Sequence, residues 1–275
     1  MARSATSFAD RYGPWALVAG GSEGLGAEIS HQLAARGLNL VLVARRAELL
    51  ATVSAEIAQR HGVSVRHHAV DLADETALAR LVGELGELEI GLLVCNAALS
   101  PIGEFLDHAP ELHARILAVN CRAPSLLVRA FAPGMVARGR GGIVLVSSMA
   151  GIQGTALVAH YSATKAYLRV LAEGLWHELR PRGVDVLACC AGPIDTPTYR
   201  KEAPAELSWL ALPPLPPAVI VRGALQALGR RPVVFPGLTP TLAAWLSQRV
   251  LPRKAAIALA SAGTRSMYRS RPPQS

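Results

Sequence analysis

Short apolar runs alternate with longer amphipathic segments along most of the chain. The runs are rich in Val, Ile, Leu and Ala, which is typical of strands buried on both faces of a parallel sheet. The longer segments, such as Ala47 to His61, have the length and spacing of helices. This alternation predicts a doubly wound α/β fold, with a central parallel sheet of about seven strands and helices on both faces. The apolar runs span residues 15–19, 38–44, 64–70, 90–94, 143–146, 184–189 and 232–235.

The composition fits one large domain. The chain has 275 residues, 51% of them hydrophobic and 17% charged, so it can bury a full core. We expect residues 1–238 to form this domain and residues 239–275 to form a helical extension packed on it. No apolar run reaches the roughly 18 uncharged residues of a membrane span, and the run at 15–19 is too short for a secretory signal. The four cysteines lack zinc-ligand spacing, so we expect a cytoplasmic protein with reduced thiols and without a metal.

The positive charge is concentrated near the end of the chain. The net charge is +8, and nine basic residues but no acidic residue follow Glu206. Segments 241–251 and 253–262 predict a helical pair in this region, and one face of the first helix is apolar. That face carries Leu242, Trp245, Leu246 and Val250. A basic amphipathic helix can lie on an anionic membrane surface, or it can pack on its own domain or on a second subunit. Packing on the domain is the favoured interpretation, and we expect no nucleic-acid partner.

A glycine-rich turn follows the first predicted strand. Residues 20–26 read Gly-Gly-Ser-Glu-Gly-Leu-Gly, and an amphipathic segment begins directly after them. A strand-to-helix turn of this kind lets backbone N–H groups approach a pyrophosphate, where a Cβ would obstruct. The turn therefore predicts a dinucleotide site that includes Gly20, Ser22, Gly24, Leu25 and Gly26.

The second predicted strand ends on Arg45 and Arg46. In dinucleotide-binding folds a carboxylate near this position holds the ribose 2′-hydroxyl of NAD(H), whereas an arginine accommodates the 2′-phosphate of NADP(H). Because two arginines and no carboxylate stand here, the sequence favours NADP(H) over NAD(H). Glu23 counts against this preference, since it adds a negative charge to the glycine-rich turn.

Tyr161 and Lys165 form a candidate proton-transfer pair. They lie four residues apart in an Ala-rich segment that is predicted to be helical, so both project from one helix face. The ordinary pKa of a phenol is about 10, and a nearby ammonium lowers it, which makes Tyr161 a usable proton donor and acceptor. Ser148 follows the strand at 143–146, at the edge of the sheet where ligands bind. Its hydroxyl can hydrogen-bond a carbonyl oxygen while Tyr161 protonates it.

The glycine spacing, together with Ser148, Tyr161 and Lys165, resembles the short-chain dehydrogenase/reductase family. The resemblance covers roughly two-thirds of the chain and implies a Rossmann fold. It implies that Lys165 also anchors the nicotinamide ribose beside Tyr161. By the same resemblance Asn120 is the fourth catalytic residue, which holds a water that relays protons from Lys165 to solvent.

The resemblance also implies cofactor contacts at the ends of the third and fourth strands. Asp71 and Leu72 match the family's Asp-hydrophobe pair beside the adenine ring, although Asp71 could instead cap the next helix. Asn96 and Ala97 keep the family pattern after the fourth strand, and Asn96 is expected to brace the central sheet.

The sixth strand ends in a turn that, by resemblance, meets the nicotinamide end of the cofactor. The residues implied there are Gly192, Ile194 and Thr196. The Pro-rich stretch 197–217 that follows lies where the family places its substrate lid, and its apolar character suggests an apolar substrate.

These expectations combine into one functional hypothesis. Residues 1–238 form a catalytic domain that binds NADP(H) and interconverts a ketone and a secondary alcohol by hydride transfer, with Tyr161 as the general acid/base. The protein would be a carbonyl reductase or alcohol dehydrogenase that forms a dimer or tetramer, as is usual for the resemblance. The alternatives are a non-catalytic NADP-binding regulator and a lyase or epimerase on the same fold.

Overall fold

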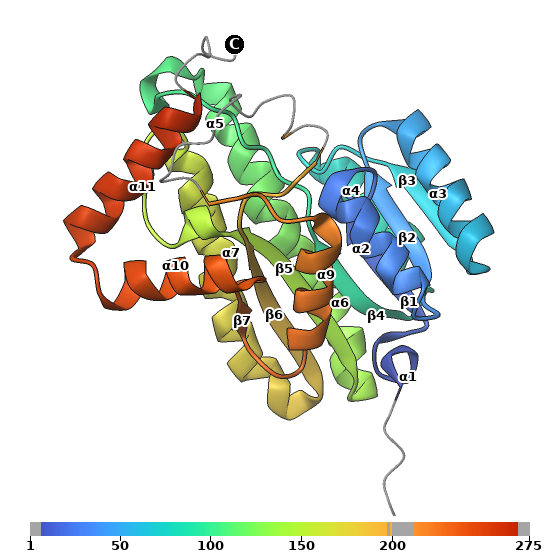
Figure 1. Cartoon of the computed structure of the whole chain (residues 1–275). Helices are drawn as coiled ribbons and strands as arrows, with labels where there is room; N and C mark the ends of the chain where they lie inside the picture. Colours follow the sequence, from blue (N-terminus) through green and yellow to red (C-terminus); the bar gives the residue numbers. More distant parts are fainter. Residues whose placement is uncertain (1–6, 197–198, 200–211, 269–275) are drawn as a thin grey trace, which may run out of the picture.

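Seven parallel strands form a single sheet in the order β3-β2-β1-β4-β5-β6-β7, in a computed structural model that describes residues 7–196, 199 and 212–268 (Figure 1). The doubly wound sheet predicted from the sequence is therefore confirmed. The chain moves outward from β1 in one direction and from β4 in the other, which leaves a crevice at the carboxyl ends of these two strands. The strands are β1 (Trp15–Ala19), β2 (Asn39–Ala44), β3 (Val65–Ala69), β4 (Ile90–Cys95), β5 (Gly141–Ser148), β6 (Val184–Ala191) and β7 (Val233–Val234).

Helices cover both faces of the sheet (Figure 1). The longer ones are α2 (Gly24–Ala34), α3 (Ala47–His61), α4 (Glu75–Glu84), α5 (Pro110–Leu117), α6 (Ala123–Arg138), α7 (Ala159–Leu179), α9 (Pro217–Ala227), α10 (Leu238–Arg249) and α11 (Arg253–Tyr268). The short ones are α1 (Phe8–Tyr12), η1 (Phe105–Asp107), the π-helical turn η2 (Ala118–Arg122), η3 (Met149–Gly151) and η4 (Arg180–Arg182).

The two faces of the sheet carry separate apolar cores because successive strand residues point in opposite directions. Ala16 and Val18 of β1 pack with α2, α3 and α9, while Leu17 and Ala19 pack with α4, α6 and α7. Both sets of side chains are fully buried or nearly so. A sheet buried on both faces explains why the strands read as continuous apolar runs.

Three helices differ in their bounds from the sequence expectation. Helix α10 spans Leu238–Arg249 instead of 241–251. The helix after the glycine-rich turn begins at Gly24 instead of Ala27, so Gly24 and Gly26 lie in its first turn. Glycine gives no capping or apolar signal, and the periodic pattern therefore marks the helix start too late. The last helix runs to Tyr268 instead of ending at Ala262, because small and polar residues there continue the helix without an apolar period.

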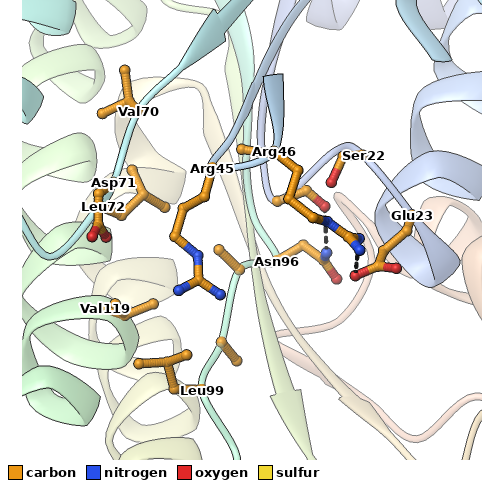
Figure 2. A pocket seen from close by; sticks show the side chains of 14 residues that line it. Ser22, Glu23, Arg45, Arg46, Val70, Asp71, Leu72, Asn96, Leu99 and Val119 are labelled. Carbon is orange, nitrogen blue, oxygen red and sulfur yellow. Dashed lines mark hydrogen bonds and ion pairs between the residues drawn. The ribbon is translucent and has the colours of Figure 1, made fainter. Parts of the chain in front are cut away.

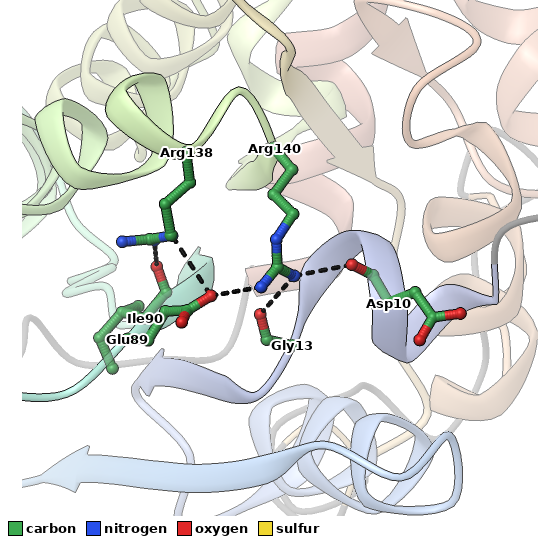
Figure 3. A network of polar contacts seen from close by, with 6 residues as sticks. All are labelled: Asp10, Gly13, Glu89, Ile90, Arg138 and Arg140. Carbon is green, nitrogen blue, oxygen red and sulfur yellow. Dashed lines mark hydrogen bonds and ion pairs between the residues drawn. The ribbon is translucent and has the colours of Figure 1, made fainter.

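A polar network closes the amino-terminal edge of the sheet, opposite the crevice (Figure 3). Arg140 Nη1 donates to the carbonyl oxygens of Asp10 (2.7 Å) and Gly13 (3.2 Å), and Arg140 Nη2 lies 2.5 Å from Glu89 Oε1. Arg138 Nε also pairs with Glu89 at 3.3 Å. These residues stand directly before β1, β4 and β5, so the network fixes α1 to the starts of three central strands.

The C-terminal helices contact the domain differently from the expectation for their apolar face. Pro240 and Ala244 are the buried residues of α10, and Pro240 lies against Gly192. The face with Leu242 and Trp245 is exposed, which contradicts the interpretation that this face packs on the domain. The small side chains of α10 face the domain, and the large apolar ones lie on the opposite side of the helix.

Helices long and apolar enough to cross a bilayer are absent from the described part of the chain. Cys95, Cys121, Cys189 and Cys190 all carry free thiols. The division at residue 238 stays a prediction.

Candidate active site

The glycine-rich turn between β1 and α2 is packed so closely that it has no room for side chains at two positions. Gly20 has a φ of 90°, in the left-handed region that favours glycine. A Cβ on Gly20 would lie 2.6 Å from the Ala97 nitrogen, and a Cβ on Gly26 would lie 1.8 Å from the Gly20 carbonyl oxygen. The turn therefore presents bare backbone, which a pyrophosphate can approach.

Asn96 holds this turn from the end of β4. Its Nδ2 donates to the Gly20 carbonyl oxygen at 2.8 Å, and its backbone N–H donates to the Ala19 carbonyl oxygen at 2.9 Å. Asn96 thus braces the turn and the strand beside it. Glu23, the N-cap of α2, makes no side-chain capping hydrogen bond, so its carboxylate does not occupy the helix N-terminus.

A pocket of roughly 270 Å³ opens beside the turn, at the carboxyl ends of the first four strands (Figure 2). Arg45 points into this pocket, whereas Arg46 turns toward Glu23, with 2.5 Å between Nη2 and Oε1. The ion pair neutralises the charge that counted against NADP(H) in the sequence. The pocket lining includes eight predicted cofactor residues: Gly20, Ser22, Arg45, Arg46, Asp71, Leu72, Asn96 and Ala97.

Asp71 forms a charged part of the pocket wall. Its carboxylate accepts hydrogen bonds from the Ala73 N–H at 3.0 Å and from Arg115 Nη2 at 2.5 Å. Burial alone would raise the pKa of Asp71, but these two hydrogen bonds and the charges of Arg115 and Arg45 lower it below its ordinary value. The capping role considered for Asp71 belongs to Asp74, whose Oδ1 accepts from the first turn of α4. The position of Arg115 could not be predicted from the sequence, since Arg115 lies on α5, far from Asp71 along the chain.

Ser148 and Tyr161 meet at the carboxyl edge of the sheet. Ser148 is the last residue of β5, and Tyr161 lies in the first turn of α7. Ser148 Oγ accepts from the Ala150 N–H at 3.1 Å, and the Ser148 hydroxyl lies close enough to the Tyr161 hydroxyl to lower its pKa. The structure therefore brings together the two hydroxyls that the sequence predicted to act on one carbonyl oxygen.

The pKa of Tyr161 differs in direction from the sequence expectation. Burial raises it to about 12, while the hydrogen bond from Ser148 lowers it and the nearby phenol of Tyr268 raises it further. The expected lowering by Lys165 is absent from these causes. The correction has a physical reason: a buried phenolate loses its hydration, and the ammonium is engaged elsewhere.

Lys165 is almost completely buried on the next turn of α7. Its Nζ donates to the Val146 carbonyl oxygen at 2.7 Å and lies 5.5 Å from the centre of the Tyr161 ring. Burial lowers the pKa of Lys165 to about 8. The ammonium is therefore mostly protonated at neutral pH, directly behind the ring of Tyr161.

Asn120 links the pocket to the catalytic helix from the π-helical turn η2. Its Oδ1 accepts from the Leu99 N–H at 2.8 Å, and its Nδ2 donates to the Leu99 carbonyl oxygen at 2.9 Å and to Thr164 Oγ1 at 3.0 Å. Leu99 lines the pocket, and Thr164 precedes Lys165. The side chain of Asn120 is thus engaged in joining two elements, and its role in a proton relay stays a prediction.

The turn after β6 lies against the glycine-rich turn. A Cβ on Gly24 would be 3.3 Å from Thr196 Cγ2, and Ile194 forms a β-bridge with Leu215. Leu25 is buried in the core beneath α2, so only its backbone is available to a cofactor. Most of the predicted lid at 197–217 lies outside the described residues.

Helix α11 lies beside the start of α7 and near Tyr161, a contact that the sequence did not reveal. Ser261 Oγ accepts from the Ala156 N–H at 3.1 Å, just before α7, and Arg265 donates to Glu104 at 3.2 Å. The helix ends at Tyr268, close enough to raise the pKa of Tyr161. Since no motif marks this helix and it lies far from Tyr161 in the sequence, only the folded chain shows the contact.

The comparison with protein families agrees with this geometry. Residues 14–207 match the short chain dehydrogenase family, and the chain belongs to that family of NAD(P)-binding oxidoreductases. A very-long-chain 3-oxoacyl-CoA reductase of Laccaria bicolor is 38% identical over 183 residues, which cover 65% of this chain and 54% of that protein. The 7beta-hydroxysteroid dehydrogenase of Clostridium sardiniense is 31% identical over 227 residues, which cover 82% of this chain and 86% of that protein. The chain thus spans about half the length of the first relative and most of the second.

Solved structures show the same fold. A 7beta-hydroxysteroid dehydrogenase structure superposes with a TM-score of 0.86 at 26% identity, covering 92% of this chain and 98% of the other. A short-chain dehydrogenase from Sphingobium yanoikuyae, solved in complex with NADPH, superposes with a TM-score of 0.74 at 30% identity, covering 95% and 98% of the two chains.

Proposed function

We propose that the protein is an NADP(H)-dependent oxidoreductase that interconverts a ketone and a secondary alcohol on an apolar substrate. The observation that carries this proposal is the approach of Ser148 and Tyr161 at the carboxyl edge of the sheet, close enough for Ser148 to affect the pKa of Tyr161, with Lys165 buried behind the ring. Ser148 polarises the substrate oxygen, and Tyr161 gives or takes the proton at that oxygen. Lys165 supplies positive charge beside the ring.

The residues of the pocket fit NADP(H). The bare backbone at Gly20 and Gly26 is a cradle that a Cβ would fill, and it suits the pyrophosphate. Arg45, which points into the pocket, suits the 2′-phosphate. The bound dinucleotide supplies or accepts the hydride. Arg46 pairs with Glu23, so the Glu23 carboxylate no longer repels the 2′-phosphate of NADP(H).

Tyr161 is suited to give a proton to a ketone oxygen. With its pKa raised to about 12, the phenol keeps its proton at neutral pH. Tyr161 can then donate that proton to the oxygen of a ketone.

The relatives support an extended apolar substrate. The two named relatives act, by their names, on very-long-chain 3-oxoacyl-CoA and on a 7beta-hydroxysteroid. Each contains a large apolar part, an acyl chain or a steroid nucleus, and an oxygen that can be oxidised or reduced. Helix α11, which ends at Tyr268 near Tyr161, would form one wall of the substrate site.

The test is NADPH consumption by the purified full chain with 3-oxoacyl-CoA esters of increasing length, 7-oxosteroids and other apolar ketones. We expect turnover with at least one class, and Tyr161→Phe should lower it by about 10²- to 10⁴-fold while NADPH binding is kept. Val170→Ala, on the exposed side of the same helix and outside the groove between α6 and α7, is the control and should keep full activity. NADPH binding without any turnover would transfer the assignment to a regulator or to a lyase or epimerase.

We also propose a homo-oligomer, which light scattering can test. An apolar groove between α6 and α7, lined by residues such as Val128, Leu171 and Leu175, suits a second copy of the chain. The cytoplasmic location stays a prediction.

A further inference from the structure

The large apolar side chains of α10 point to solvent. They lie on the face opposite Pro240 and Ala244, which are buried against the domain. A contiguous exposed apolar patch of this kind marks an interaction site. The exposed fractions are 92% for Leu238, 64% for Leu242, 54% for Trp245, 39% for Leu246 and 52% for Val250.

Basic side chains flank this apolar face. Arg249 follows Trp245 by four residues and so shares its side of α10. Arg253 and Lys254 begin α11, and both are exposed. No acidic residue follows Glu206 in the sequence, so the extension itself has no carboxylate to pair with them.

We propose that α10 and the start of α11 dock on an anionic lipid surface. The apolar side chains of α10 would lie among the lipid chains, and Arg249, Arg253 and Lys254 would contact the headgroups. The 12 residues of α10 span about 18 Å, which suits a helix that lies in the interface. Leu238, Leu242 and Trp245 repeat along its whole length, as an interfacial helix requires.

A second copy of the chain fits this face less well than a lipid surface. A two-fold interface brings the same patch of both copies together. Arg249 and Lys254 would then face their own counterparts without an acidic residue of the extension to pair with them. Anionic headgroups supply the missing negative charge, and the proposal therefore commits to a membrane.

Docking would also orient the substrate side, a step that rests on the proposed function. Arg253 Nη1 donates to the Ile152 carbonyl oxygen at 3.1 Å, next to the catalytic strand end, and α11 continues from there to Tyr268 beside Tyr161. The helix pair thus runs from the docking face to Tyr268, which influences Tyr161, and Figure 1 shows α10 and α11 following one another at the end of the chain. An apolar ketone dissolved in the lipid would enter from this side.

The test is cosedimentation of the full chain with vesicles of phosphatidylcholine, with and without phosphatidylserine. We expect wild-type protein to bind the phosphatidylserine vesicles, and added salt to weaken binding. The double variant Leu242→Ser/Trp245→Ser should bind at least about tenfold more weakly. Arg249→Glu, which changes two charges, should bind roughly twentyfold more weakly, since one basic residue is worth about fivefold. The matched controls are Val219→Ser on α9 and Arg80→Glu on α4, which should bind like wild type.

Two results would overturn the proposal. One is wild-type protein that fails to bind phosphatidylserine vesicles, or a double variant that binds them as well as wild type. The other is a wild-type dimer that the double variant converts to a monomer in light scattering, without vesicle binding, which would assign the face to a second copy. NADPH turnover of a water-soluble ketone without vesicles, expected to be equal in all these variants, separates the two proposals. Wild-type protein that turns over the ketone but does not bind the vesicles refutes the docking proposal and leaves the proposed function standing.

Discussion

On the cofactor side of the catalytic residues, backbone packs directly against backbone, whereas on the substrate side a helix is held by a few side-chain hydrogen bonds. A Cβ on Gly26 would lie 1.8 Å from the Gly20 carbonyl oxygen, so the glycine-rich turn has one arrangement. Helix α11 is tied by contacts such as Ser261 to Ala156 and Arg265 to Glu104, which other residues could replace. We therefore expect substitutions in the glycine-rich turn to disturb cofactor binding strongly, and substitutions in the contacts of α11 to be better tolerated.

The largest effect is expected from adding one methyl group to the glycine-rich turn. Gly26→Ala should lower the free energy of unfolding by about 3 kcal/mol or more and abolish NADPH binding, because its Cβ would overlap the Gly20 carbonyl. Gly174→Ala, in helix α7, is the matched control: its Cβ meets nothing within 4 Å, so it should stabilise the protein by up to about 1 kcal/mol. Chemical denaturation and NADPH titration measure both effects, and equal stability of the two variants would contradict the close packing.

The next largest effect concerns the charge in the pocket. Arg45→Ala should weaken NADPH binding by about 10- to 100-fold and leave NADH binding unchanged, because a charge-assisted hydrogen bond to the 2′-phosphate is lost. Arg46→Ala should have a smaller effect on NADPH, since Arg46 is already paired with Glu23. Fluorescence titration with both nucleotides gives the ratio. If both nucleotides weaken equally in Arg45→Ala, the argument from the 2′-phosphate fails.

Lys165 should make the free energy of unfolding depend on pH. Its pKa is lowered from 10.5 to about 8, so the unfolded chain binds more protons between these values and the free energy of unfolding rises with pH across this window. Lys165→Met should remove this contribution, which is at most about 1.4 kcal/mol per pH unit. Denaturation curves from pH 8 to pH 10 compare the two proteins, and parallel pH dependences would show that Lys165 titrates normally.

The smallest effect is expected on the substrate side. Tyr268→Phe removes a phenol that raises the pKa of Tyr161, so the alkaline limb of the pH–activity profile should shift to lower pH by less than about one unit. The stability of the fold should hardly change. A profile identical to that of wild type would place Tyr268 outside the influence of the catalytic hydroxyl.

The same contrast explains which features the sequence could predict. Helix Ala47–His61 and strand Trp15–Ala19 match the predicted bounds, because their patterns depend on burial alone. The pairing of Glu23 with Arg46 and of Asp71 with Arg115 could not be predicted, since each depends on where two loops or helices meet. Likewise, the amphipathic pattern of α10 showed an apolar face but could not show that this face points to solvent.

The network around Arg140 determines how the molecule could be attached to a surface. It holds α1 at the amino-terminal edge of the sheet, at the opposite end of the strands from Ser148 and the pocket (Figures 1 and 3). A fluorophore or sensor-chip tether placed immediately ahead of α1 would therefore be anchored in a fixed direction. The pocket, the edge of the sheet with Ser148 and Tyr161, and the exposed face of α10 would then face the analyte solution.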